Sequence, residues 1–193
     1  MVLPTLLPAQ AVRSISQFGL LMYWARLSSD RPFPRLNDFQ PPPRLHDPQQ
    51  FIFWNVENSK DGRVFAALGQ GRYVTEGFNA ILSGKTMSSV VPASMREFAL
   101  ETANLCASSG RPVYSVIATF NADGKRVDCE RLLLPFGCSG RVGQLLASLQ
   151  LISLDGQFSR ASIIKTFEGH SEVMLSGVVK TEHQPVSETA LPV

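Results

Sequence analysis

Apolar residues recur every three or four positions between residues 11 and 27, which predicts a helix. One face of this helix carries Val12, Ile15, Phe18, Met22 and Ala25. Further apolar residues flank that face, so we expect the helix to be covered on more than one side. The domain itself, a second copy of the chain, or both would supply the cover. We expect Ile15, Phe18 and Met22 to lie at a homodimer interface.

Two N-terminal segments show no regular pattern. Residues 1–10 contain two prolines, and we expect them to be loose. Residues 28–50 contain six prolines, and proline fixes the backbone angle φ and lacks an N–H donor. We therefore expect this second segment to run extended over the surface of the domain.

From residue 51 the pattern changes to that of strands. Residues 51–57 and 63–69 flank a polar turn and predict a hairpin. Short helical turns, interrupted by glycines, follow within residues 72–91. A longer helix is predicted next, over residues 94–109, and Gly110 is well placed to end it.

Three longer strands complete the regular pattern, at residues 112–120, 125–136 and 141–154. Their two faces are both largely apolar, so the sheet should be covered on both sides. We expect helix 11–27 to cover the outer face. Residues 161–167 and 172–179 have the pattern of further short strands.

These patterns predict an α+β fold with one domain and two flanks. The expected segments are a loose N-terminus at 1–10, a helix and proline-rich segment at 11–49, a core at 50–154, and a partly disordered C-terminal extension at 155–193.

Composition and charge exclude some functions. Hydrophobic residues make up 44% of the chain and charged residues 18%, which is typical of a globular protein. The net charge of +2 is spread evenly, so no segment has the concentrated positive charge of a nucleic-acid-binding surface. Three cysteines without a CxxC pair indicate a reduced, cytoplasmic protein. The apolar run at 18–25 is too short to span a membrane, so we expect no membrane insertion.

A series of short motifs runs in order through residues 19–154. The residues that carry it are Tyr23, Trp24, Pro34, Asp38, Pro41, Gly69, Gly77, Gly84, Glu130, Leu134 and Pro135. In this series the chain resembles a bacterial, alphaproteobacterial-type family of the PAS superfamily, formerly known only as a domain of unknown function. The chain departs from the pattern at Gln70, where a small hydroxyl residue is more common, and at the added Gly71.

The resemblance implies a PAS-like fold, a five-stranded antiparallel sheet with helices on one face, to which helix 11–27 would add a cover. It also implies a non-catalytic sensory or interaction module in signal transduction or regulation. Such a module acts through ligand-dependent or constitutive contacts with a separate signalling protein or with a second copy. No enzyme activity is expected.

Two alternatives stay open. A small α+β enzyme would need a general base, and Asp128, Glu130 and Glu76 are the candidates. A haem- or flavin-binding sensor is the other. However, residues 72–109 contain no histidine to bind haem iron and no Asn-Cys-Arg motif of flavin-binding PAS domains. We predict no cofactor and no metal site, and leave open a small-molecule ligand of unknown identity.

The polar residues of interest are Asp38, Glu130 and Arg131. Glu130 either faces a pocket as a sensor of ligand or protons, or forms an exposed ion pair between strands. Asp38 is expected to cap backbone N–H groups of the proline-rich segment. Tyr23 and Trp24 serve either as interface anchors or as packing on the chain's own sheet.

Overall fold

A computed structural model describes residues 5–43, 47–60, 62–120, 126–153 and 170–181. Its strands are β1 (Leu6–Leu7), β2 (Phe51–Ser59), β3 (Gly62–Gln70), β4 (Val113–Phe120), β5 (Arg126–Cys138), β6 (Arg141–Ser153) and β7 (Ser171–Val179). Its helices are α1 (Ile15–Leu27), α2 (Arg72–Phe78), α3 (Met87–Val90) and α4 (Ala93–Ser109). Short 3-10 turns lie at Ala9–Ala11, Leu36–Asp38 and Pro48–Gln50.

The prediction of a five-stranded antiparallel sheet is wrong. The sheet has seven strands in the order β1-β7-β4-β5-β6-β2-β3, and β1 pairs with β7 in parallel. The five strands predicted for the core are neighbours in this order, and each pairs antiparallel to the next. Strand β7 adds to β4, where it pairs backbone groups that an edge strand would leave open. The two extra strands turn the expected antiparallel sheet into a mixed one.

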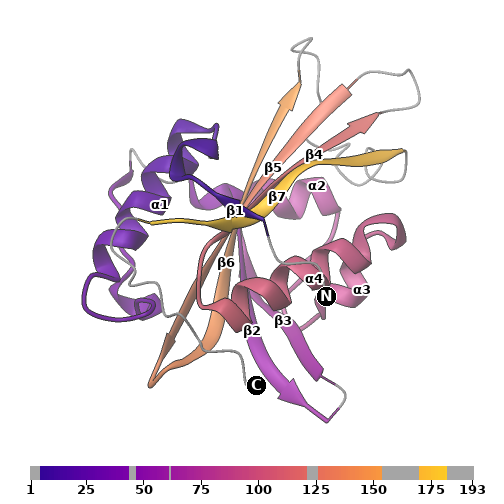
Figure 1. Cartoon of the computed structure of the whole chain (residues 1–193). Coiled ribbons are helices and arrows are strands. Elements are labelled where there is room, and N and C mark those ends of the chain that lie inside the picture. The colour runs from indigo at the N-terminus through magenta and orange to yellow at the C-terminus, as the bar shows by residue number, and fades with distance from the viewer. Residues whose placement is uncertain (1–4, 44–46, 61, 121–125, 154–169, 182–193) are drawn as a thin grey trace, which may run out of the picture.

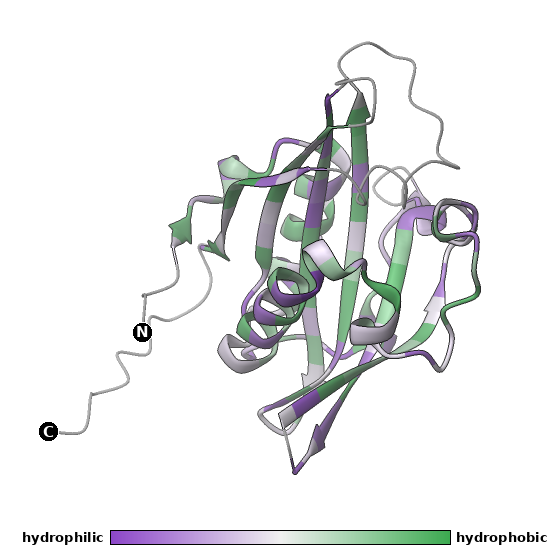
Figure 2. Cartoon of the chain, turned by 90° about the vertical axis from the view of Figure 1, so that its right-hand side faces the viewer, coloured by the Kyte–Doolittle hydropathy of each residue, from purple (hydrophilic) through white to green (hydrophobic). Residues whose placement is uncertain are grey.

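Helix α1 covers one face of the sheet, and α2, α3 and α4 lie on the other side (Figure 1). The hydropathy colouring shows apolar positions alternating with polar ones along several strands (Figure 2). Cover on both faces explains why β4 and β5 are buried along most of their length and why β6 is buried in its middle. Helix 11–27 covers the outer sheet face as predicted, although it begins four residues later, at Ile15.

The stripe of α1 that packs on the sheet is separate from the stripe expected at a homodimer interface. Its buried residues are Gln17, Leu20, Leu21, Trp24 and Ala25. Ile15 and Met22 instead keep 89% and 43% of their surface exposed, and Phe18 is partly buried. Both stripes repeat every three to four residues, and contacts with the sheet select the stripe that contains Trp24.

The proline-rich segment is tied to the far end of β5. The Gly137 N–H donates to the carbonyl of Pro34 over 3.0 Å. The indole N–H of Trp24 donates to the carbonyl of Pro135 over 2.8 Å, and Trp24 is fully buried. Tyr23 donates its hydroxyl to the carbonyl of Gln40 over 2.9 Å. The N-terminal helix and the extended segment after it are therefore part of the folded domain.

Helix α4 ends where the sequence predicts. Gly110 follows it in the left-handed conformation, with φ of 63°, and donates its N–H to Cys106. The side of α4 toward the sheet buries Met95, Ala99, Thr102, Ala103, Cys106 and Ala107. In the part of the chain that the structure describes, no helix has the length and apolar character needed to cross a membrane.

Candidate functional site

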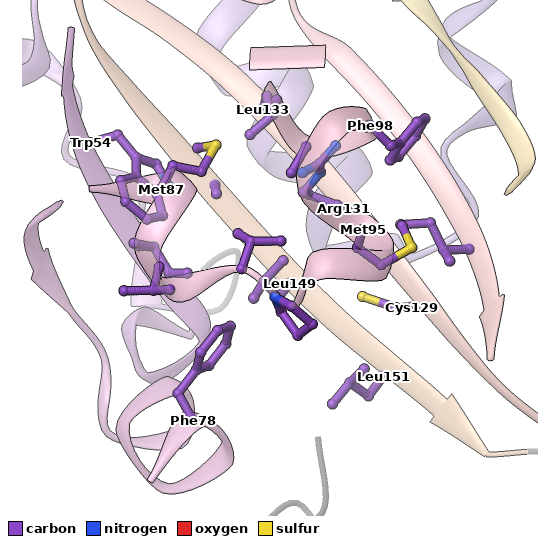
Figure 3. Close-up of a pocket in the computed structure, with 17 residues that line it drawn as sticks. Trp54, Phe78, Met87, Met95, Phe98, Cys129, Arg131, Leu133, Leu149 and Leu151 are labelled. Atoms are coloured by element: carbon purple, nitrogen blue, oxygen red, sulfur yellow. The ribbon is translucent and has the colours of Figure 1, made fainter. Parts of the chain in front are cut away.

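A cavity of about 90 Å³, partly open to solvent, lies between the sheet and the helical segment from α2 to α4. Figure 3 shows its lining side chains converging from both sides. The sheet contributes residues that include Trp54, Cys129, Arg131, Leu133, Ala147 and Leu149. The helical segment contributes residues that include Phe78, Met87, Val90, Met95, Phe98 and Ala99. The cavity is thus lined almost wholly by apolar groups.

Strand β5 supplies the cavity from alternate positions. Cys129, Arg131 and Leu133 line it, because side chains two residues apart share one face of a strand. The intervening Glu130 and Leu132 face α1 and are fully buried there. One strand therefore forms the floor of the cavity and the seat of the N-terminal helix.

Among the described residues that line the cavity, Arg131 is the only charged one. Its Nη2 donates to the hydroxyl of Thr102, and its guanidinium carbon lies 5.4 Å from the centre of the Phe98 ring. Its buried Nε has no hydrogen-bond partner. Among the described residues no carboxylate forms an ion pair with it. Burial lowers the pKa of Arg131 to about 10, because the guanidinium loses hydration without gaining a counter-charge.

A second unpartnered polar group lies beside Arg131. Ser115 on β4 is directly opposite Arg131 on β5, so their side chains share the face that α4 covers. The hydroxyl oxygen of Ser115 is buried and has no hydrogen-bond partner. Ser115 and Arg131 thus form a small polar patch with spare hydrogen-bonding capacity in an apolar interior.

The two cysteines near the cavity are buried thiols. Burial raises the pKa of Cys129 to about 12 and also raises the pKa of Cys106. Both thiols therefore stay protonated at neutral pH and are poor nucleophiles. This arrangement fits the interpretation of Cys106 and Cys129 as small buried hydrophobic residues.

Gln70, a departure from the family pattern, organises the wall of the cavity. Its amide nitrogen donates to the hydroxyl of Thr75 and to the carbonyl of Ala80, and its amide oxygen accepts from the Leu82 N–H. These bonds fix the segment that carries Phe78. The sequence analysis noted Gln70 only as a departure from the motif series, because no periodic pattern marks its partners in α2 and the loop after it.

Glu130 lies on the opposite side of the sheet from the cavity. It is fully buried, and its Oε2 accepts the Ser14 N–H at the start of α1 over 3.1 Å. Burial and the carboxylate of Glu130 together raise the pKa of Tyr114. Gln17 donates to the backbone carbonyls of Glu130 and Ser148. Glu130 is therefore neither a pocket residue nor an exposed ion-pair partner.

Other residues of the motif series have structural positions outside the cavity. The carboxylate of Asp38 is exposed and pairs with Arg31 at 3.4 Å, which differs from the expected backbone cap. Gly84 has a φ of 78° and donates its N–H to the carbonyl of Ala67. The remaining members are buried or lie in the ladder: Pro41, Gly69, Gly77 and Leu134.

The residues considered for catalysis do not meet at the cavity. Asp128 pairs with Arg126 at 2.6 Å and with Arg13 at 3.8 Å, and Glu76 pairs with Arg72 at 3.5 Å on α2. Sites for cofactor-sized ligands enclose roughly 300–1,000 Å³, more than this cavity offers. Among the described residues, no three His, Cys, Asp or Glu side chains are grouped to hold a metal ion.

No family model, curated protein or solved structure matches this chain. The resemblance to a PAS family therefore stays a prediction from the motif series.

Proposed function

We propose that this chain is a non-catalytic sensory or interaction module that binds a small molecule between the sheet and α4. It acts in the cytoplasm, in signal transduction or regulation, by changing its contacts with a separate signalling protein or with a second copy. The observation that carries the proposal is the apolar cavity of about 90 Å³. An engineered apolar cavity of about 150 Å³ holds benzene, so this smaller and partly open cavity suits a molecule with a short apolar body.

The position of the cavity favours signalling to α1. A ligand touching Cys129 or Leu133 presses on β5, whose alternate residues seat α1 on the opposite face. Arg131 also connects β5 to α4 through Thr102. A ligand in the cavity would therefore affect the positions of both α1 and α4. The free thiols of Cys106, Cys129 and Cys138 agree with a reducing compartment.

The binding test uses 1-hexanol, an uncharged probe, with isothermal titration calorimetry and thermal unfolding. Ala147→Leu fills the cavity from β6, and Ala93→Leu makes the same change at an exposed position at the start of α4. We expect the wild type and Ala93→Leu to bind and to unfold at higher temperature with the probe. Ala147→Leu should fold but not bind. Equal binding by both variants would contradict the cavity as the site.

The outer stripe of α1 supports homodimerisation as a second part of the proposal. Ile15, Phe18 and Met22 lie one helical turn apart, and Ile15 keeps 89% of its surface exposed. Light scattering on an Ile15→Asp, Met22→Asp double variant tests this contact. We expect a dimer to become a monomer, while Leu68→Asp, at an exposed position on β3, leaves it intact. An unchanged assembly in the double variant would overturn the contact.

A further inference from the structure

We infer that the ligand of this cavity is a small organic monoanion: a carboxylate with a short apolar body, whose head group pairs with Arg131. This inference rests on the proposed function and names the class of molecule that the cavity selects. The juxtaposition that supports it is a single guanidinium, without a carboxylate partner in the described residues, in an otherwise apolar lining.

The protein leaves the charge of Arg131 incompletely compensated. A guanidinium has five N–H donors, and here the hydroxyl of Thr102 takes one from Nη2 while the buried Nε has no acceptor. The ring of Phe98 contributes a weaker cation–π contact. Buried charges in proteins are usually paired, because desolvation disfavours an isolated ion. An anionic ligand would supply the missing counter-charge.

Access to this charge is through the cavity. Arg131 is only partly buried as a residue, and it belongs to the lining (Figure 3). In the view of Figure 3 it lies among Met95, Phe98 and Leu133, so a head group that reaches it leaves the rest of the ligand against apolar side chains. The site thus offers one polar end and one apolar end.

The chemistry favours a carboxylate over a more highly charged head group. A carboxylate carries one negative charge and accepts two parallel hydrogen bonds from an arginine. Arg131 is the only cation among the described lining residues, so a dianion would enter with one charge uncompensated by them. The buried hydroxyl of Ser115, directly across the ladder from Arg131, is a further unpartnered donor on the same face. The volume of about 90 Å³ is smaller than that of a cavity that holds benzene, so the apolar body is short, and the end of a six-carbon chain would extend through the open side.

The experiment compares three straight-chain probes of six carbons each: hexanoate, 1-hexanol and hexylamine. Isothermal titration calorimetry should give hexanoate at least about tenfold tighter binding than 1-hexanol, because the charged head group gains hydrogen bonds to Arg131. Hexylamine should bind more weakly than 1-hexanol. Inorganic phosphate, which has no apolar body, should not bind measurably.

Variants separate the charge from the cavity. Arg131→Gln should reduce hexanoate affinity to that of 1-hexanol while leaving 1-hexanol binding unchanged, and Arg131→Lys should keep part of the preference. Ala147→Leu should lose both probes. Equal affinities for hexanoate and 1-hexanol in the wild type would overturn the anion inference and leave the proposed function standing. Binding of neither probe would overturn both. If Arg131→Gln does not fold, the relative affinities of the three probes for the wild type and for Arg131→Lys test the inference instead.

Discussion

The guanidinium carbon of Arg131 on β5 lies 5.4 Å from the centre of the Phe98 ring on α4. The same guanidinium donates to Thr102, one helical turn further along α4. One side chain therefore links the floor of the cavity to the helix that covers it. A molecule that pairs with Arg131 would contact both layers at once, which makes this residue the centre of the account.

Thr102→Val tests how strongly the interior depends on the hydroxyl partner of Arg131. The substitution keeps the shape of the side chain and removes the acceptor, leaving a desolvated cation with one partner fewer. We expect a loss of about 1–3 kcal/mol in the free energy of unfolding, measured with urea. Ser108→Ala removes an exposed hydroxyl from the same helix and should change stability by less than about 0.5 kcal/mol. Equal effects would contradict the role assigned to Thr102.

Trp24→Phe tests the attachment of α1 to β5. It leaves the buried carbonyl of Pro135 without its 2.8 Å hydrogen bond and opens a small void. We expect a loss of at least about 1–3 kcal/mol in denaturant unfolding. The neighbouring Tyr23→Phe removes a more exposed hydrogen bond to Gln40 and should cost less than about 1 kcal/mol. A larger loss for Tyr23→Phe would reverse the assignment of Trp24 as the anchor.

Glu130→Gln separates the two faces of the sheet. The change removes a buried carboxylate that accepts the Ser14 N–H at the positive end of α1, so we expect a loss of about 1–3 kcal/mol in stability. Hexanoate affinity should stay unchanged, because Glu130 does not line the cavity. Glu57→Gln, at an exposed position on β2, serves as the control and should alter neither quantity. Loss of hexanoate binding in the folded Glu130→Gln variant would place Glu130 at the site after all.

Thiol chemistry reports the burial of Cys129. At pH 8 a thiol-labelling reagent should modify only the exposed Cys138 in the native protein, and all three cysteines in guanidinium chloride. Cys138→Ser should abolish native labelling. Burial raises the pKa of Cys129 from 9.0 to about 12, so the folded chain holds this proton more tightly than the unfolded chain.

The sign of the linked pH effect follows from that shift. The contribution of the Cys129 thiol to stability is complete below pH 9 and is lost as the pH rises from 9 toward 12. We expect stability to fall between pH 9 and 10 more steeply in the wild type than in Cys129→Ala, as measured by urea unfolding. Parallel slopes would contradict the burial of this thiol.

Local sequence patterns predicted most of the helices and strands, but not which strands pair when they are far apart in the sequence. The β2–β3 hairpin, α4 and its end at Gly110 depend on residues close in the sequence, and these predictions are confirmed. The partner of β7 depends on β4, about 60 residues earlier, and β1 adds only Leu6 and Leu7. A strand of two residues is too short to show a periodic pattern in the sequence.

The orientation of α1 shows a second limit. Two apolar stripes with the same spacing run along it, and the buried one contains Gln17. Gln17 is buried because its amide donates to carbonyls on β5 and β6. Those partners are more than a hundred residues away, so the local pattern could not show that the stripe with Gln17 is the one that packs on the sheet.

The site was only partly predictable for a related reason. Arg131 stood out as a polar residue in an apolar strand, but both faces of that strand are apolar. The alternation along β5 could not show whether Glu130 or Arg131 faces the helices of the core. The packing of α4 decides this, because Thr102 and Phe98 both contact Arg131.

The most direct test of the account is methyl NMR of the protein labelled at its methionines, titrated with hexanoate. Met87 and Met95 line the cavity, whereas Met22 and Met174 are exposed elsewhere. We expect the methyl signals of Met87 and Met95 to shift with added hexanoate and those of Met22 and Met174 to stay in place. Ala147→Leu should remove the shifts. Signals of Met87 and Met95 that stay in place, or shifts confined to Met22 and Met174, would contradict the account.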